Sequence, residues 1–195
     1  MANMASVAYA IEGSEKSLEE ILRAIYFAMT NEKYWTEYEA CINLGFTEKE
    51  LDDKRLGGEI SDAPTLENGV LRFYAEERWG LQDFEELLRQ KFPDIKVYWT
   101  VEESGCDVYC SNDKEGKYFP DRFYADICVD GDYYSEYFVS EDSLFKWLSN
   151  ITHREINSFD DVEEFNSNYE GSCEDNENFI NVHIFDVDED TEEGA

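Results

Sequence analysis

Positive charge is scarce in this chain, above all in its last third. The 195 residues contain 16 Lys and Arg against 47 Asp and Glu, a net charge of −31. Residues 130–195 hold only two basic side chains, Lys146 and Arg154, against 20 acidic ones. A surface of this sign repels phosphates and anionic lipid headgroups. The sequence therefore excludes direct binding of nucleic acid or of an anionic membrane, and it predicts a basic partner.

Long apolar segments and a cysteine framework are also missing. No run of 18 apolar residues exists, which a membrane-spanning helix would need, and the first residues lack the basic and apolar regions of a signal peptide. The five cysteines form an odd set without framework spacing, so reduced thiols are expected. We expect a cytoplasmic protein, in the host cytoplasm if a phage encodes it, with no metal and no cofactor.

Recognised catalytic motifs are absent as well. The chain has no Gly-rich phosphate loop, no H-E-x-x-H and no Ser nucleophile elbow, and its two histidines, His153 and His183, lie far apart. Asp94, Glu115 and Lys117 follow the order of a metal-dependent nuclease motif. Glu115 and Lys117 nevertheless fall in a turn-rich segment, and a nuclease must attract the phosphates that this chain repels. We predict no catalytic residues and no enzyme.

Aromatic residues are abundant instead. The chain has 13 Phe, 13 Tyr and 4 Trp, and hydrophobic residues make up 42% of it. Disordered acidic chains are poor in these residues, so this chain is expected to fold.

Hydrophobic periodicity predicts the elements of the first half of the chain. A strand is expected at 5–13, then an amphipathic helix on which Leu18, Ile21, Leu22, Ile25 and Met29 share one face and Ser17 with Glu20 forms a capping box. Residues 34–69 are interpreted as an insertion with a short helix, opened by a second capping box of Thr47 and Glu50. A strand at 70–79 and a helix ended by Pro93 follow.

Two hairpins, two helices and a strand are predicted in the second half. The first hairpin turns around Ser104-Gly105, and the second, 123–139, turns at Asp130-Gly131, a dipeptide that favours the type I′ turn because both residues take positive φ. Helices are expected after Ser140 and after Ser158, each of which can accept hydrogen bonds from the first turn. A strand at 179–185 precedes a charged tail.

This order of elements predicts an α+β protein. Its mostly antiparallel sheet would carry two amphipathic helices on one face, a ferredoxin-like arrangement. We expect a domain over residues 1–152 that includes the helical insertion at 34–69. An acidic helix–strand extension over residues 153–185 would pack on the same domain, and residues 186–195 would form a disordered acidic tail.

One segment resembles a known group of proteins. It runs over about residues 70–130, from "LRFYAEERW" through "FEELLRQKFPDIKVYW" to "EESGCDVYCSNDKEGKYFPDRFYADI". A strand ending near a Trp, a helix, a "(Y/F)P" stop and an acidic-aromatic hairpin are similar to the ferredoxin-like domain of small plasmid- and phage-encoded proteins. The resemblance implies this fold and a mobile-element origin. By analogy, it extends to DNA mimics of the anti-CRISPR type.

Acidic side chains on two predicted elements could imitate a row of phosphates. Carboxylates at i and i+3 or i+4 on a helix lie about 5 to 6 Å apart, and duplex DNA has one phosphate per about 3.4 Å of axis on each strand. The expected acidic contacts are Asp126, Asp130, Asp132, Glu136, Asp160, Asp161, Glu163, Glu164, Glu174 and Asp175, and the expected aromatic contacts are Tyr124, Tyr133 and Tyr137.

The sequence thus favours a nucleic-acid mimic that blocks the basic cleft of a host nucleic-acid-binding protein or ribonucleoprotein, of anti-CRISPR or anti-restriction type. The alternative is a non-catalytic, ferredoxin-like partner-binding module whose acidity is only a surface property. The identity of the partner, the choice between DNA and RNA, and the oligomeric state stay open at this point.

Overall fold

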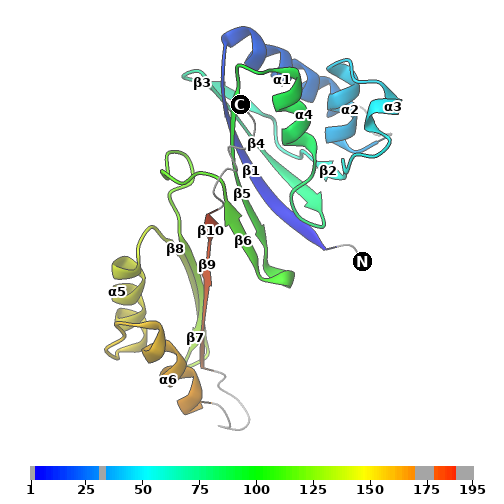
Figure 1. The fold of residues 1–195 in the computed structure, drawn as a ribbon. Helices are drawn as coiled ribbons and strands as arrows, with labels where there is room; N and C mark the ends of the chain where they lie inside the picture. Colours follow the sequence, from blue (N-terminus) through cyan, green and yellow to red (C-terminus); the bar gives the residue numbers. More distant parts are fainter. Residues whose placement is uncertain (1–2, 31–33, 170–177, 188–195) are drawn as a thin grey trace. The chain divides into compact units, whose positions relative to one another are not determined.

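The computed structural model describes residues 3–30, 34–169 and 178–187 (Figure 1). This part of the chain forms two compact units, one that extends to Lys114 and takes in Val187, and one over Glu115–Asp186. The described residues form six α-helices and two sheets in which antiparallel pairing dominates. The predicted α+β class is confirmed.

The first unit is built around a sheet with helices on one of its faces. In chain order its elements are β1 Met4–Glu12, α1 Glu15–Ala28, α2 Thr36–Asn43, α3 Glu48–Leu51, β2 Gly58–Glu59, β3 Thr65–Glu67, β4 Val70–Arg78, α4 Phe84–Lys91, β5 Lys96–Glu103, the 3-10 turn η1 Ser104–Cys106, β6 Val108–Ser111 and β10 Asp186–Val187. The strand order is β10-β6-β5-β1-β4-β2, and β3 also pairs with β4.

Strand alternation produces the core of the first unit. Alternate residues of β1 and β4 are buried, and Tyr9 faces Phe73 across the pair with ring centroids 4.7 Å apart. Leu18, Ile21 and Ile25 of α1 recur at helical spacing and are fully buried in the same cluster. Such a stripe stabilises a helix mainly through the apolar area it removes from water.

The start of α1 differs from the predicted capping box. The helix begins at Glu15, and Ser14 is its N-cap, whose side chain accepts a hydrogen bond from the Ser17 backbone. Asp94 accepts hydrogen bonds from the Ser14 backbone N–H at 3.1 Å and from the Ser17 hydroxyl at 3.0 Å. The carboxylate of Asp94, from outside the helix, thus stabilises this start, and the hydrogen bonds from Ser14 and then Ser17 lower the pKa of the Asp94 carboxyl.

The segment 34–69 is only partly the helical insertion that was expected. The capping box of Thr47 and Glu50 is confirmed. Residues 65–67, however, form β3, a hairpin with β4 that turns through Asn68 and Gly69 at φ +53° and +75°. Asn-Gly with two positive φ values is a strong hairpin signal that the interpretation as an insertion overlooked.

The second unit is a smaller sheet with two helices. Its elements are β7 Phe123–Val129, β8 Asp132–Phe138, α5 Glu141–Thr152, α6 Phe159–Tyr169 and β9 Phe179–Ile184, with strand order β8-β7-β9. The turn at Asp130-Gly131 has φ +53° and +87°, which confirms the type I′ prediction. Ser140 is the N-cap of α5, as predicted.

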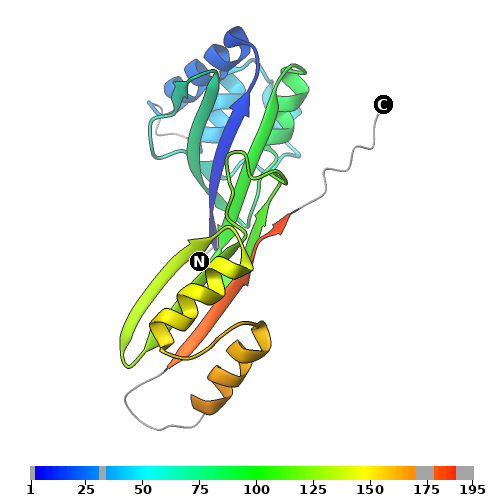
Figure 2. The ribbon, with the colours of Figure 1, turned by 90° about the vertical axis from the view of Figure 1, so that its left-hand side faces the viewer.

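Both helices of the second unit lie over the same face of its sheet (Figures 1 and 2). Phe123, Ala125 and Ile127 of β7 are buried in a cluster with residues of α5 and α6. Asn166 of α6 adds a polar contact to the edge strand β9: its side-chain amide donates to the Ile180 carbonyl at 2.9 Å and accepts from the Ile180 N–H at 2.8 Å. The two helices therefore cover one face of the sheet, and polar and aromatic side chains lie on the other face.

Two boundaries differ from the sequence-based prediction. The hairpin 123–139 and α5 were assigned to a domain ending at 152, but the structure groups both with α6 and β9, because β7 pairs with β8 and β9 and all of them share one core. Residues 186–195 were predicted to be disordered, whereas residues 186–187 form β10 and residues 188–195 lie outside the described part.

Candidate partner-binding surface

The exposed side of α6 carries three carboxylates, Asp160, Glu163 and Glu164, which we call the acidic row. Val162 and Phe165 bury the opposite side of the helix against the sheet, so the spacing of the apolar residues turns the acidic row outward. All three side chains are exposed, and within the described residues none of them forms an ion pair with Lys, Arg or His. The row is therefore available to cationic groups from elsewhere.

Asp161 was expected to belong to this surface, but it has a structural role. Its Oδ2 accepts a hydrogen bond from the Asn157 backbone N–H at 2.8 Å and from the Ser158 hydroxyl at 2.9 Å, and the Ser158 hydroxyl in turn accepts from the Asp161 N–H. These bonds, first of all the one from Asn157, lower the pKa of the Asp161 carboxyl. The side chain closes the N-terminus of α6 and is a poor candidate for a partner contact.

We predict that Asp161→Ala loosens the start of α6, whereas Asp160→Ala, one position away, does not. Because the folded-state pKa of Asp161 is lowered, its contribution is present at neutral pH and is lost as the pH falls through that pKa. Amide hydrogen exchange at Asn157, whose N–H donates to this carboxylate, should speed up in the Asp161 variant only. Equal exchange in both variants would contradict the capping role.

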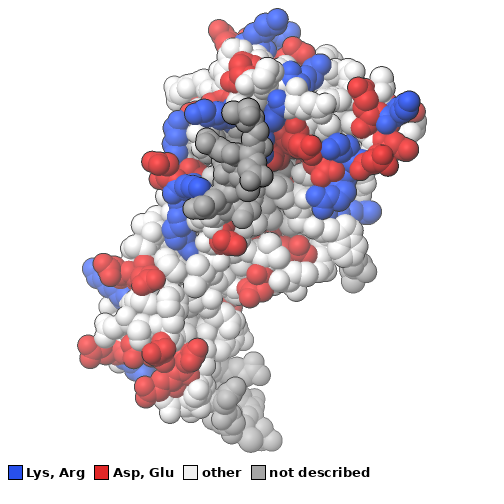
Figure 3. All heavy atoms as spheres, viewed as in Figure 1, with Lys and Arg blue, Asp and Glu red and all other residues white. Residues whose placement is uncertain are grey.

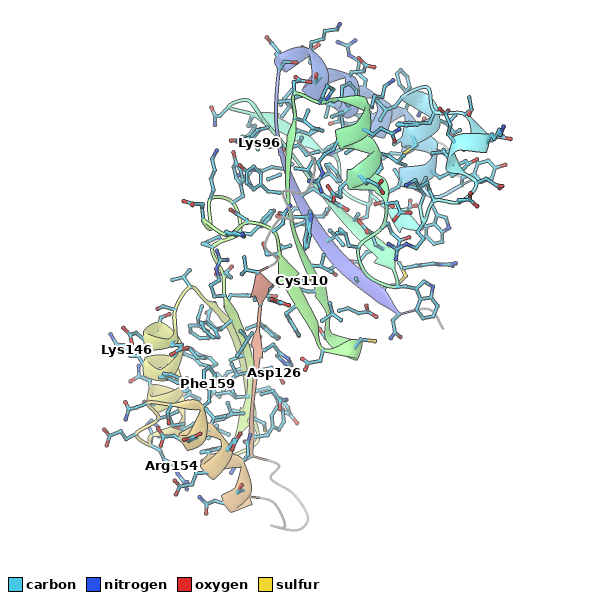
Figure 4. All side chains as sticks on the ribbon, in the orientation of Figure 1. Lys96, Cys110, Asp126, Lys146, Arg154 and Phe159 are labelled. Atoms are coloured by element: carbon cyan, nitrogen blue, oxygen red, sulfur yellow. The ribbon has the colours of Figure 1, made fainter. Side chains whose placement is uncertain are left out.

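The acidic residues of the hairpin do not form one row. In the register of β7 and β8, Asp126 pairs with Ser135, whereas Glu136 pairs with the buried Ala125 and Asp132 pairs with Val129. Asp126 therefore lies on the sheet face away from the helices (Figure 4), and Asp132 and Glu136 belong to the helix-covered side. The acidic residues predicted as contacts on this hairpin therefore lie on both of its faces.

Asp126 is already engaged by neighbouring side chains. Its two carboxylate oxygens lie 3.0 Å from His183 Nε2 and 3.1 Å from the donating amide of Asn181, both on β9. Asp130 sits exposed at the hairpin turn. Glu174 and Asp175, also predicted as contacts, lie outside the described residues.

The three predicted tyrosines share the face of Asp126. Tyr124 lies 4.8 Å from Tyr137 and 5.8 Å from the His183 ring, measured between centroids, and Tyr133 is 74% exposed. We call this face, with Tyr124, Asp126, Tyr133, Tyr137 and His183, the aromatic face. Because α5 and α6 cover the other side of the sheet, a flat partner surface cannot contact the acidic row and the aromatic face together.

A small hollow adjoins α6. It has a volume of about 110 Å³, and its lining includes Glu155, Asp161 and Glu164 with Arg154. The guanidinium of Arg154 also lies 5.3 Å from the centroid of the Phe165 ring. In Figure 3 acidic side chains gather over the helices of this unit. The hollow is too small for a nucleotide, and a basic side chain of the same chain, Arg154, already lies among its carboxylates.

No family model matches the chain, and no curated protein or solved structure was found to be similar to it. Within residues 3–30, 34–169 and 178–187, no helix combines the length and apolar character needed to cross a bilayer. The same residues contain no group of three or more His, Cys, Asp and Glu side chains arranged to hold a metal ion. The acidic row and the aromatic face are therefore the features from which a function can be argued.

Proposed function

We propose that the protein is an acidic nucleic-acid mimic that occupies the basic nucleic-acid-binding cleft of a host defence protein, of anti-CRISPR or anti-restriction type, and that a phage or another mobile element encodes it. The observation that carries this proposal is the acidic row, in which Asp160, Glu163 and Glu164 are exposed and receive no cation from the described part of their own chain. A row of this kind attracts the Lys and Arg side chains that a nucleic-acid-binding protein offers to phosphates.

The charge density of α6 supports the comparison with nucleic acid. Residues 160 to 164 rise about 6 Å along the helix axis, a length over which one DNA strand carries about two phosphates. The helix presents three exposed carboxylates over this length. Because the packed helix holds them in place, less ordering entropy is lost on binding than with charges on an unfolded segment.

We also propose that the first unit is a ferredoxin-like domain. The strand order β5-β1-β4-β3, with antiparallel neighbours throughout and with α1 and α4 as the crossover helices, supports this assignment. The additional strands β2, β6 and β10 would extend such a sheet. In this proposal the first unit is the scaffold, and the second unit supplies the mimicking surface.

The second candidate function is a partner-binding module that does not imitate nucleic acid. The aromatic face favours it, because Tyr133 is 74% exposed and Tyr137 is 41% exposed, and tyrosines are enriched at protein interfaces. Since the aromatic face and the acidic row lie on opposite sides of the sheet, substitutions separate the two candidates. Tyr133→Ala with Tyr137→Ala should spare the binding of a mimic and abolish that of an aromatic-face module.

We predict that the isolated protein binds neither DNA nor RNA but displaces them from a basic partner. Its net charge of −31 motivates this result. A partner captured from host lysate would be loaded with fluorescent DNA or RNA and titrated with the protein at two or more salt concentrations. Release of the label, weaker at high salt, is expected. Submicromolar binding of nucleic acid by the isolated protein in a gel shift would end the proposal.

A further inference from the structure

Two glutamates are buried together in the core of the first unit. Glu37 comes from α2 and Glu77 from β4, and both are 0% exposed. Gly58 pairs with Glu77 across β2 and β4, and its N–H donates to the carboxyl group of Glu37, so the two glutamate side chains are neighbours. Ionised carboxylates are almost never fully buried without a cation, so the protonation of this pair requires an explanation.

Glu77 has the surroundings of a carboxylate. Its Oε1 accepts a hydrogen bond from the Tyr9 hydroxyl at 2.5 Å, and its Oε2 accepts one from the Gln82 backbone N–H at 2.5 Å. Burial raises the pKa of Glu77, but these two bonds from donors favour its charged form, so Glu77 is the member of the pair better able to hold the charge. Tyr9, Gln82 and Glu37 thus all lie around the carboxylate of Glu77.

Glu37 has the surroundings of a carboxylic acid. Its Oε2 accepts a hydrogen bond from the Gly58 backbone N–H at 3.0 Å. Its Oε1 is buried, and no described group donates a hydrogen bond to it. Since only a protonated carboxyl group can donate, a proton on Oε1 turns the contact with Glu77 into a hydrogen bond and satisfies this buried atom.

No basic side chain compensates the pair. Within the described residues, neither Glu37 nor Glu77 forms an ion pair. The other titratable groups around it are Tyr9 of β1, Glu59 of β2, Cys41 of α2 and Glu85 of α4. Glu85 contacts Arg89 through one oxygen, and its other oxygen is buried without a partner. None of the four is a cation, so none of them compensates a second negative charge on the pair.

We propose that Glu37 and Glu77 form a proton-binding site that holds a single shared proton. This proton keeps α2 and β2 packed against β4 in the core of the first unit. When that proton leaves, two carboxylates face each other in a site without cations, and the segment that carries Glu37 separates from the sheet. The proposal is independent of the acidic row, which lies in the other unit.

The pH dependence of the stability follows from the direction in which the pKa of Glu37 is shifted. Burial, and then the charge of Glu77, raises the pKa of Glu37 well above its usual value. The folded state therefore keeps a proton that the unfolded state releases near pH 4.3, and the stabilisation is lost as the pH rises toward the folded-state pKa. Burial also raises the pKa of Tyr9, and burial with Glu37 raises that of Cys41 to about 12, so these groups act in the same direction only at higher pH.

Hydrogen exchange at Gly58 tests the proposal, because its N–H donates to Glu37. In the wild-type protein the opening constant, corrected for intrinsic exchange, should rise by about tenfold per pH unit from about pH 5 until the folded-state pKa is reached. Glu37→Gln retains a donor and cannot ionise, so it should remove this slope. The control Glu76→Gln, at the neighbouring exposed position of β4, should keep it.

An infrared spectrum supplies a readout that does not depend on stability. At pH 7.5 the surface carboxyls are ionised, and the wild-type protein should show the carbonyl band of a protonated carboxyl group, which Glu76→Gln retains and Glu37→Gln loses. Absence of the band in the wild-type protein would overturn the proposal, as would a pH slope in Glu37→Gln equal to that of the wild type. If Glu37→Gln does not fold, the wild-type and Glu76→Gln spectra still decide: persistence of the band supports the proton site, and its absence refutes it.

Discussion

Reversing Asp160, Glu163 and Glu164 together to Lys is expected to weaken the complex with the basic partner by roughly a hundredfold in Kd, or about 3 kcal/mol. Three attractive contacts become repulsive ones, because the new cations face the Lys and Arg side chains of the partner. The loss should appear mainly as faster dissociation, since the row is held in a packed helix. Surface plasmon resonance at two salt concentrations measures it. Asp161 is left intact, because its carboxylate caps α6.

A charge-matched variant serves as the control. Asp53, Asp62 and Glu67 are exposed residues of the first unit, and changing them to Lys alters the net charge by the same amount. This variant should slow association modestly, because it reduces only the long-range attraction. If it weakens binding as much as the α6 variant does, the partner responds to overall charge, and the acidic row is not the interface. Circular dichroism checks that both variants remain folded.

Gly58→Ala is expected to destabilise the first unit by about 3 kcal/mol, near the upper end for an added methyl group in a packed core. A Cβ at this position would lie 2.2 Å from Cδ of Glu37. The Glu37 side chain could move only by giving up the hydrogen bond that it accepts from the Gly58 N–H, which would leave buried polar atoms unsatisfied. Urea unfolding followed by circular dichroism measures the loss.

Two comparisons make this result specific. Gly105→Ala, where no atom lies within 4 Å of the added Cβ, should change the free energy of unfolding by less than about 0.5 kcal/mol. In a Glu37→Ala background, where the obstructing carboxyl group is gone, Gly58→Ala should cost under about 1 kcal/mol. A full cost in that background would show that the strain lies in the backbone of β2 and not in the contact with Glu37.

Local chemistry made most of the elements predictable. Asp130-Gly131 specifies a two-residue turn, and with it the register of the 123–139 hairpin, because few other residues adopt positive φ at two successive positions. Ser140 and the pair Thr47 and Glu50 open their helices through bonds that span only three residues. Asn68-Gly69 carried the same information and was overlooked.

Packing decided which acids are available for binding. Asp160 and Asp161 are adjacent and identical in type, yet only Asp161 meets the donors of Asn157 and Ser158. The sequence spacing predicted an acidic helix, and Asp160, Glu163 and Glu164 were among the contacts predicted on it. It could not predict that α5 and α6 separate the acidic row from the tyrosines, because this depends on which face of the sheet the helices cover.

The sequence by itself determined the acidity, the α+β class and the local turns and caps, since each depends on composition or on residues a few positions apart. Strand alternation even places Glu77 among the inward residues of β4, with Leu71, Phe73 and Ala75. Only the tertiary structure brings Glu37 to it, across 40 positions of sequence, and excludes water and basic side chains from the pair. The protonation of a carboxyl group depends on its solvation and its hydrogen-bond donors, and for a buried group the folded chain supplies both.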